Sequence, residues 1–198
     1  MKGKMIALLI LALVVASVMG IAGAYNGLVR ENELVNEAWA QVQNVYQRRL
    51  DLIPNLVETV RGYAEHERST FTAVTEARAN ASRAIQNITP EALSDPAVFK
   101  KFQDAQESMG QAISRLLLVV ERYPELKANE NFLALQSQLE GTENRISVER
   151  RRFNEVVRTY NVKIKVFPAN ILAGIFGFKE KVYFEAREGA EMAPVVKF

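Results

Sequence analysis

The chain begins with one long apolar segment. Residues 5–24 carry no charged side chain and follow two lysines, Lys2 and Lys4. As a helix this segment would span ~30 Å, about the thickness of the hydrocarbon core of a bilayer. The pattern predicts a membrane anchor. A secretory signal peptide that is cleaved after Ala24 is the alternative, because Ala22 and Ala24 give the small-x-small form of a cleavage site.

Beyond the anchor, apolar residues recur at steps of three, four and seven, which is the spacing of helices that bury one face. Pro54 interrupts the first such stretch. Because a proline inside a helix removes a hydrogen bond and clashes with the preceding turn, a helix is expected to end near Asp51. Asp95 followed by Pro96 is typical of a helix start. The expected helices cover residues 25–51, 54–88, 96–122 and 129–165.

Long helices with short connections favour an antiparallel bundle, and the alternation typical of strands never persists. The sequence therefore predicts an all-α protein: an N-terminal transmembrane helix followed by an antiparallel up-and-down four-helix bundle with long helices. The expected divisions are a basic tail over residues 1–4, the anchor over 5–24, the bundle over 25–166, and an apolar C-terminal segment and tail over 167–198.

The last expected helix and the run after it predict a contact surface. When helices alternate in direction, the fourth helix ends near the bilayer, followed by the uncharged run from Ile171 to Phe178. Basic residues outnumber acidic ones between Arg145 and Lys165. A basic helix followed by an apolar aromatic segment is typical of a lipid surface, although apolar patches also mark protein contacts. The candidate lipid or oligomer contacts are Arg150, Arg151, Arg152, Ile171, Leu172, Ile175, Phe176 and Phe178.

Small residues form a stripe along the anchor at every fourth position. Such a stripe allows two membrane helices to pack closely and predicts self-association, whereas the general abundance of Ala and Gly in membrane helices is the alternative explanation. The candidate residues are Ala12, Ala16, Gly20 and Ala24.

On the fourth expected helix, Asn154 and Asn161 stand one heptad apart. Buried amides there would fix the register or bind another helix; a surface position is the alternative.

Composition excludes several kinds of chemical site. The chain has 0 Cys and 1 His, which excludes thiolate metal sites and multi-histidine sites within one chain. His66-Glu67 begins like a zinc-protease motif, but Thr70 stands where the second histidine would be. Without Lys2 and Lys4, basic and acidic residues are equal in number, unlike a nucleic-acid binder. We expect no catalytic residue, cofactor, metal or nucleic-acid partner.

Ordered motifs along nearly the whole chain resemble the LemA family. They are Tyr25-Asn26, Asn36 to Trp39, Arg48 to Val57, Gly62 to Ala64, His66-Glu67, Tyr123 to Ala128, Phe132 to Gln136, Phe153-Asn154, Tyr160-Asn161, Phe167-Pro168 and Gly177-Phe178. Phe153 stands where the family often has Tyr. The resemblance implies a bacterial, membrane-anchored bundle of antiparallel helices without an established catalytic activity.

The function favoured by these observations is a non-enzymatic, membrane-anchored helical scaffold that forms homo-oligomers and organises membrane or membrane proteins. The alternative is an anchored adaptor that binds or regulates another membrane protein, such as a protease, through the same C-terminal segment. Membrane lipid is an expected partner. Basic residues before the anchor favour an N-terminus inside the cell, which would put the bundle in the periplasm; a cytoplasmic bundle stays open.

Overall fold

The computed structural model describes residues 2–185 and contains no strand within them. The predicted all-α class is therefore confirmed. The long helices are α1 (Lys2–Arg61), α2 (Arg68–Asn87), α3 (Pro96–Val120) and α5 (Glu130–Lys165), and the short ones are η1 (Ala92–Ser94), α4 (Pro124–Lys127) and α6 (Ala169–Phe176). The end of the expected C-terminal tail, residues 186–198, lies outside the described residues.

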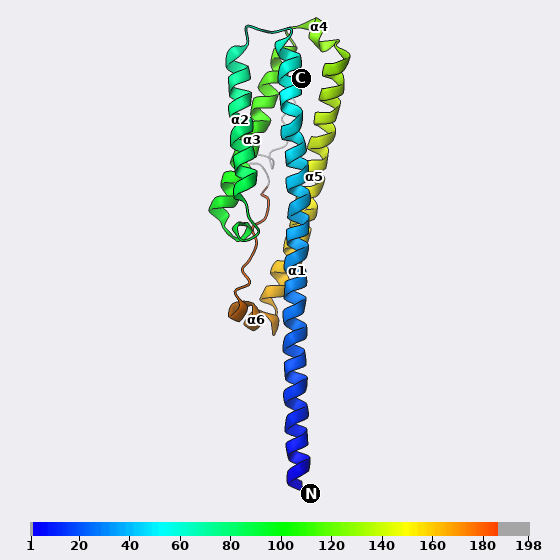
Figure 1. Cartoon of the computed structure of the whole chain (residues 1–198), viewed down its shortest axis with the longest axis vertical. Helices are drawn as coiled ribbons and strands as arrows, with labels where there is room; N and C mark the ends of the chain where they lie inside the picture. Colours follow the sequence, from blue (N-terminus) through cyan, green and yellow to red (C-terminus); the bar gives the residue numbers. More distant parts are fainter. Residues whose placement is uncertain (1, 186–198) are drawn as a thin grey trace, which may run out of the picture.

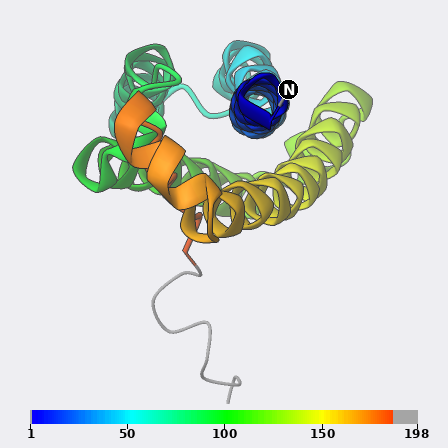
Figure 2. The ribbon, with the colours of Figure 1, turned by 90° about the horizontal axis from the view of Figure 1, so that it is seen from below.

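Four long helices run side by side with alternating directions, as Figure 1 shows. The most extensive packing joins α1 to α5 and α2 to α3, and α1 also packs on α2. Seen along the long axis, α2 and α3 lie to one side of α1 and α5 lies to the other (Figure 2). The predicted antiparallel arrangement is present, and α1 passes from the anchor into the bundle without a break.

The prediction that one helix ends near Asp51 and another begins at Pro54 is wrong. Helix α1 continues through Pro54 to Arg61. Pro54 has no N–H to donate to the carbonyl oxygen of Leu50, one turn earlier. That oxygen instead accepts a hydrogen bond from Nε of Arg78 in α2 at 2.9 Å. A side chain from a neighbouring helix thus replaces the bond that the proline removes.

The expected third and fourth helices are confirmed almost to the residue by their caps. The Asp95 side chain accepts hydrogen bonds from the backbone N–H groups of Ala97 and Val98, at the start of α3. The Asn129 side chain accepts one from the N–H of Phe132 at 3.0 Å, at the start of α5. Such caps satisfy donors that the first turn leaves unpaired.

An aromatic cluster lies in the core where α1, α3 and α5 meet. Trp39, Phe99, Phe102 and Phe153 contribute to it from these helices, and Phe184 joins them from the chain after α6. The Phe184 ring centroid lies 4.9 Å from that of Phe99 and 5.5 Å from that of Phe153. Tilted and edge-to-face rings at such distances attract one another in addition to the gain from burial. Residues 179–185, here called the strap, therefore complete the core.

Candidate functional site: the juxtamembrane surface and the strap

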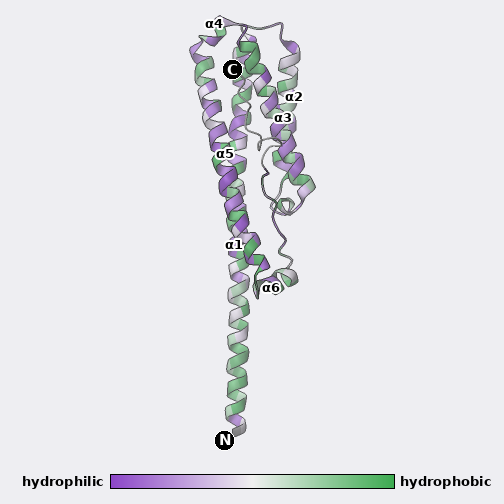
Figure 3. Cartoon of the chain, turned by 180° about the vertical axis from the view of Figure 1, so that it is seen from behind, coloured by the Kyte–Doolittle hydropathy of each residue, from purple (hydrophilic) through white to green (hydrophobic). Residues whose placement is uncertain are grey.

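Helix α1 supplies a candidate membrane anchor. It is the one helix among residues 2–185 that is long and apolar enough to cross a membrane, and its apolar window is not buried by the rest of the chain. Figure 3 shows this hydrophobic part extending alone beyond the bundle. Of the candidate stripe, Ala12, Ala16 and Gly20 are exposed and Ala24 is half-buried. The stripe is open to a partner, and self-association through it stays a prediction.

Helix α6 lies beside α1 where the anchor ends. It packs against both α1 and α5. The ring of Tyr25, the first residue after the anchor, lies 4.7 Å from the ring of Phe176 and 6.0 Å from that of Phe178, measured between centroids. The run after the fourth long helix thus returns to the anchor, as alternating helix directions predicted.

Gly177 ends α6 and turns the chain back toward the bundle. Its φ of 75° is in the left-handed region, which side chains with a Cβ rarely adopt. The N–H of Phe178 donates to the carbonyl oxygen of Ala173 at 2.9 Å, which closes the end of the helix. The turn separates α6 from the strap, in which the side chains of Lys181 and Phe184 are buried.

Apolar side chains on and just before α6 form an exposed patch, which we call the juxtamembrane surface. Its members are Val166, Phe167, Ile171, Ile175 and Phe176, and they are 49%, 80%, 54%, 70% and 52% exposed.

Two residues that were predicted to belong to this surface face the core instead. Leu172 and Phe178 are half-buried and pack against the core. The predicted contact set therefore divides into outward-facing and inward-facing residues, and only the outward-facing ones are free to meet lipid or another molecule.

The three arginines of the predicted contact set lie apart from this surface. Arg151 precedes the end of α5 at Lys165 by about 21 Å of helix. The guanidinium of Arg150 lies 4.6 Å from the centre of the Phe184 ring and donates to the carbonyl oxygen of Glu185 at 3.0 Å. Arg150 thus holds the strap, whereas a lipid or oligomer contact of Arg151 and Arg152, which are exposed, stays a prediction.

Two asparagines bind the strap to α5. The side-chain amide of Asn161 donates to the carbonyl oxygen of Lys181 and accepts from its N–H, each at 2.9 Å. Asn154 makes the same pair of bonds with Phe184, also at 2.9 Å. One heptad of a helix rises ~10.5 Å, and three residues of an extended chain rise ~10 Å, so the two spacings match. The asparagines bind an extended segment where the sequence suggested a helix.

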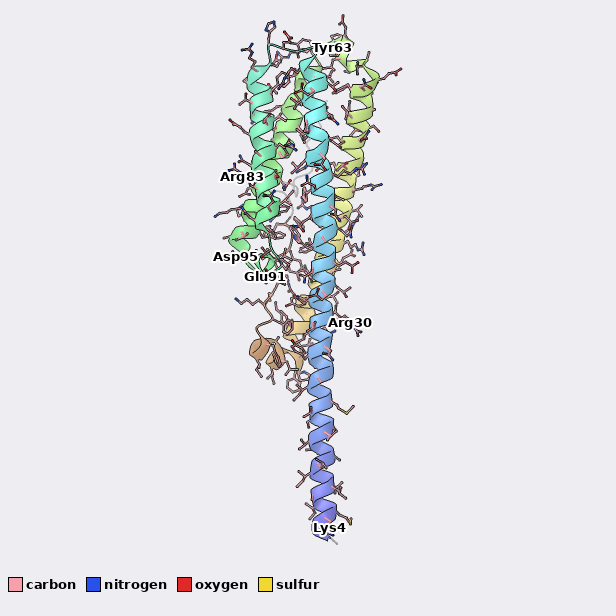
Figure 4. The ribbon with its side chains drawn as sticks, in the orientation of Figure 1. Lys4, Arg30, Tyr63, Arg83, Glu91 and Asp95 are labelled. Carbon is pink, nitrogen blue, oxygen red and sulfur yellow. The ribbon has the colours of Figure 1, made fainter. Side chains whose placement is uncertain are left out.

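The strap also joins α5 to the segment between α2 and α3. The ammonium group of Lys181 donates to the carbonyl oxygen of Pro90, and the N–H of Val182 donates to that of Leu93, both at 2.9 Å. Residues of α5 and of the connection between α2 and α3 therefore hold the strap in place. Glu91 and Asp95, labelled in Figure 4, mark this end of the α2–α3 pair.

Burial shifts the pKa of two groups around the strap. It raises the pKa of Tyr160 to about 12, and the Tyr160 hydroxyl donates to the carbonyl oxygen of Lys179 at 3.0 Å. It lowers the pKa of Lys181, a shift that the nearby Glu91 carboxylate opposes. Both shifts follow from the removal of polar groups from water.

A buried polar contact links three long helices deeper in the bundle. The guanidinium of Arg49 donates to Oε1 of Gln106 at 2.7 Å and to Glu143 at 3.2 Å. This contact joins α1, α3 and α5, and it leaves the buried Nε of Arg49 without a hydrogen-bond partner. Elsewhere, His66 is exposed in the loop after α1, and residues 2–185 hold no group of three His, Asp or Glu side chains that could bind a metal.

Comparisons of the sequence with known proteins identify its family. The chain is 27% identical to magnetosome protein MamQ 2 of Paramagnetospirillum magneticum, over 98% of this chain and 77% of that protein. It is 28% identical to magnetosome protein MamQ of Magnetospirillum gryphiswaldense, over 97% of this chain and 75% of that protein. It is 25% identical to protein LemA of Metamycoplasma hominis, over 84% of this chain and 71% of that protein. The sequence pattern of the LemA family matches residues 38–198, so the chain belongs to the LemA family.

Proposed function

We propose that this protein is a non-enzymatic, membrane-anchored helical scaffold that self-assembles and organises membrane or membrane proteins. The observation that carries the proposal is the continuity of α1 from the anchor into the bundle, with the juxtamembrane surface beside the junction. A continuous helix holds the bundle at a set distance from the bilayer, because it has no linker that could bend. Such a joint suits a structural role better than a flexible tether does.

The relatives support this proposal by their names. MamQ 1 and MamQ 2 of Paramagnetospirillum magneticum are named as magnetosome proteins, not for a reaction. In this chain, the buried polar groups around Arg49, Asn154 and Asn161 are hydrogen-bonded to the chain itself and hold its elements together. These groups are used for architecture, and a site for catalysis would need convergent groups that face a substrate.

The mass of the full-length protein in mild detergent and in lipid nanodiscs tests the proposal. We expect large assemblies, visible as uniform particles by electron microscopy. Uniform monomers in both environments would contradict self-assembly.

A pair of anchor variants then tests the small-residue stripe. Ala16→Leu with Gly20→Leu should reduce the mass, because larger side chains hold two helices apart. Val14→Leu with Val18→Leu, on the opposite face of the same helix, is the matched control and should leave the mass unchanged. Equal masses for both pairs would reject the stripe as the contact.

An anchored adaptor is the second candidate, favoured by a groove between α3 and α5. The groove has a volume of about 580 Å³, and its lining includes Ile113, Leu117 and Leu139. A photo-crosslinking residue at Leu117 should trap a second membrane protein if this function is correct, whereas the same residue at the exposed Leu133 should not. Equal crosslinking at both positions would contradict a specific docking groove.

A further inference from the structure

The geometry points to a second membrane contact beside the anchor. We propose that the juxtamembrane surface inserts into the boundary between headgroups and acyl chains of the leaflet that faces the bundle, and that its occupant is lipid. The inference rests on the membrane anchoring of the proposed function and not on self-assembly. It assigns Phe167, Ile171 and Ile175 a role in orienting the bundle on the bilayer.

The length of the apolar part of α1 places α6 at the depth of the membrane interface. If residues 5–24 fill the ~30 Å hydrocarbon core, Tyr25 lies at the interface, where tyrosine is enriched in membrane proteins. Because the Tyr25 and Phe176 rings are 4.7 Å apart, Phe176 lies at the same depth. The anchor therefore delivers this surface to the lipid without any change in fold.

Charge along α1 gives an independent estimate of that depth. No charged residue stands between Lys4 and Arg30. Figure 4 shows α6 on the anchor side of Arg30, beside the uncharged part of α1. Figure 1 shows that only the anchor extends beyond α6 at this end of the molecule. The lower side of α6 consequently faces the bilayer.

The side chains at this position are those that lipid favours. The run from Val166 to Phe178 is uncharged, and Phe167 and Ile175 are 80% and 70% exposed. Transfer of such side chains from water to an apolar phase is favourable in proportion to the area that is removed from water. A short uncharged helix that lies along the interface gains this energy and keeps its own backbone hydrogen-bonded.

The contact is chiefly apolar. Lys165, just before the run, pairs with Glu180 at 2.7 Å, so its charge is already balanced. We therefore expect the surface to insert into a neutral phosphatidylcholine membrane as well as an anionic one, because lipid charge adds only a modest attraction per free basic residue.

Site-directed spin labelling of the full chain tests this proposal. Because the chain has 0 Cys, a cysteine at position 175 carries the only label. The labelled Ile175→Cys protein is reconstituted in phosphatidylcholine vesicles, and collisions with oxygen and with a water-soluble nickel complex are measured. Leu13→Cys in the anchor is the lipid reference and Leu118→Cys on the distal bundle is the water reference; the two native side chains are 70% and 69% exposed.

We expect an oxygen-to-nickel collision ratio several-fold higher at position 175 than at position 118, and nearer to that at position 13. A ratio equal to that at position 118 would overturn the proposal, because the surface would then face water. Low collision with both reagents would also overturn it, since a second copy or another protein would then cover the surface. A label at Phe167→Cys repeats the measurement on the neighbouring turn and guards against a local effect of one substitution.

The same vesicles separate this contact from self-assembly. Broadening of the Leu13→Cys spectrum, which is lost on dilution with unlabelled protein, reports assembly in the membrane. A lipid-exposed position 175 without broadening would support the lipid contact and reject assembly through the anchor. Broadening with a water-exposed position 175 would reject the lipid contact and leave the scaffold intact.

Discussion

Helix α6 and the strap follow one another in the chain but have opposite relations to the core. The run that contains α6 is uncharged and exposes Phe167, Ile171 and Ile175. The strap contains four charged residues among residues 179–185, yet it buries Lys181 and Phe184. From hydropathy along the chain, one would expect the run that contains α6 to be buried and the strap to be exposed. The comparison shows that burial here depends on the hydrogen bonds of the backbone as well as on the polarity of the side chains.

The difference has a physical cause in backbone hydrogen bonding. A helix satisfies its own N–H and C=O groups, so α6 can present apolar side chains outward, including to lipid. An extended segment cannot, and it needs partners wherever it is buried. Asn154 and Asn161 supply these partners at a spacing that suits an extended chain. The strap therefore buries Lys181 and Phe184, the two residues whose backbone is bound by these amides, whereas α6 needs no such partners.

Truncation of Phe184 should have the largest effect on stability. Phe184→Ala removes a ring from the aromatic cluster and should lower the free energy of unfolding by about 3–5 kcal/mol, the usual cost of a buried Phe→Ala change. Urea unfolding in mild detergent, followed by circular dichroism, measures it. Phe167→Ala, just before α6, is the matched control, with a loss of at most about 0.5 kcal/mol expected because its side chain is 80% exposed. Equal losses would contradict the contrast between the two segments.

Removal of the Asn161 amide should have the next largest effect. Asn161→Ala leaves the N–H and C=O of Lys181 without partners and should cost about 1–3 kcal/mol. Asn55→Ala, at an exposed position in α1, is the control and should cost nothing, because Ala favours a helix. The same denaturation experiment compares the two. No loss at position 161 would mean that the strap does not depend on these hydrogen bonds.

The raised pKa of Tyr160 predicts a loss of stability in alkali. Its pKa is about 12 in the folded protein and 10.0 when unperturbed, so the unfolded chain loses this proton first. The contribution of Tyr160 is fully present below pH 10 and is lost as the pH rises toward 12. Between pH 9 and pH 11, Tyr160→Phe should lose less stability than the parent protein. The exposed Tyr183→Phe is the control, and an identical pH profile for all three proteins would refute the prediction.

The smallest effect on stability is expected at Ile175. Ile175→Ser changes a side chain that is 70% exposed. The free energy of unfolding should therefore change by at most about 0.5 kcal/mol, and the helix content should not change measurably. Denaturation and circular dichroism check this. A large loss of stability would show that Ile175 belongs to the bundle core, and the contrast between α6 and the strap would then disappear.

Much of the helical architecture was predictable because its signals are local. Asp95 and Asn129 begin helices through hydrogen bonds to nearby residues, and a heptad pattern of apolar residues identifies α5. The prediction failed at Pro54, because the side chain that compensates for the proline, Arg78, comes from another helix. The loss of one backbone bond is visible in the sequence; its replacement across the bundle is not.

The candidate site divides in the same way. The arrival of the run from Ile171 to Phe178 at the anchor followed from counting helices, and the exposure of Ile171 and Ile175 fits an uncharged run outside the bundle. The strap was missed because Lys179, Lys181 and Glu185 give it the composition of a surface loop. The signal that could have identified it was the pair Asn154 and Asn161, whose spacing matches an extended partner.

The sequence by itself determined the candidate anchor, the long helices, their caps and their alternating directions, since each depends on the order of neighbouring residues. Only the tertiary structure decided that α1 passes through Pro54, that Arg150 contacts the strap, and that Phe184 completes the core. These features depend on contacts between residues far apart in the chain. Such contacts become favourable only when the bundle has already brought the helices together, so no local pattern of residues encodes them.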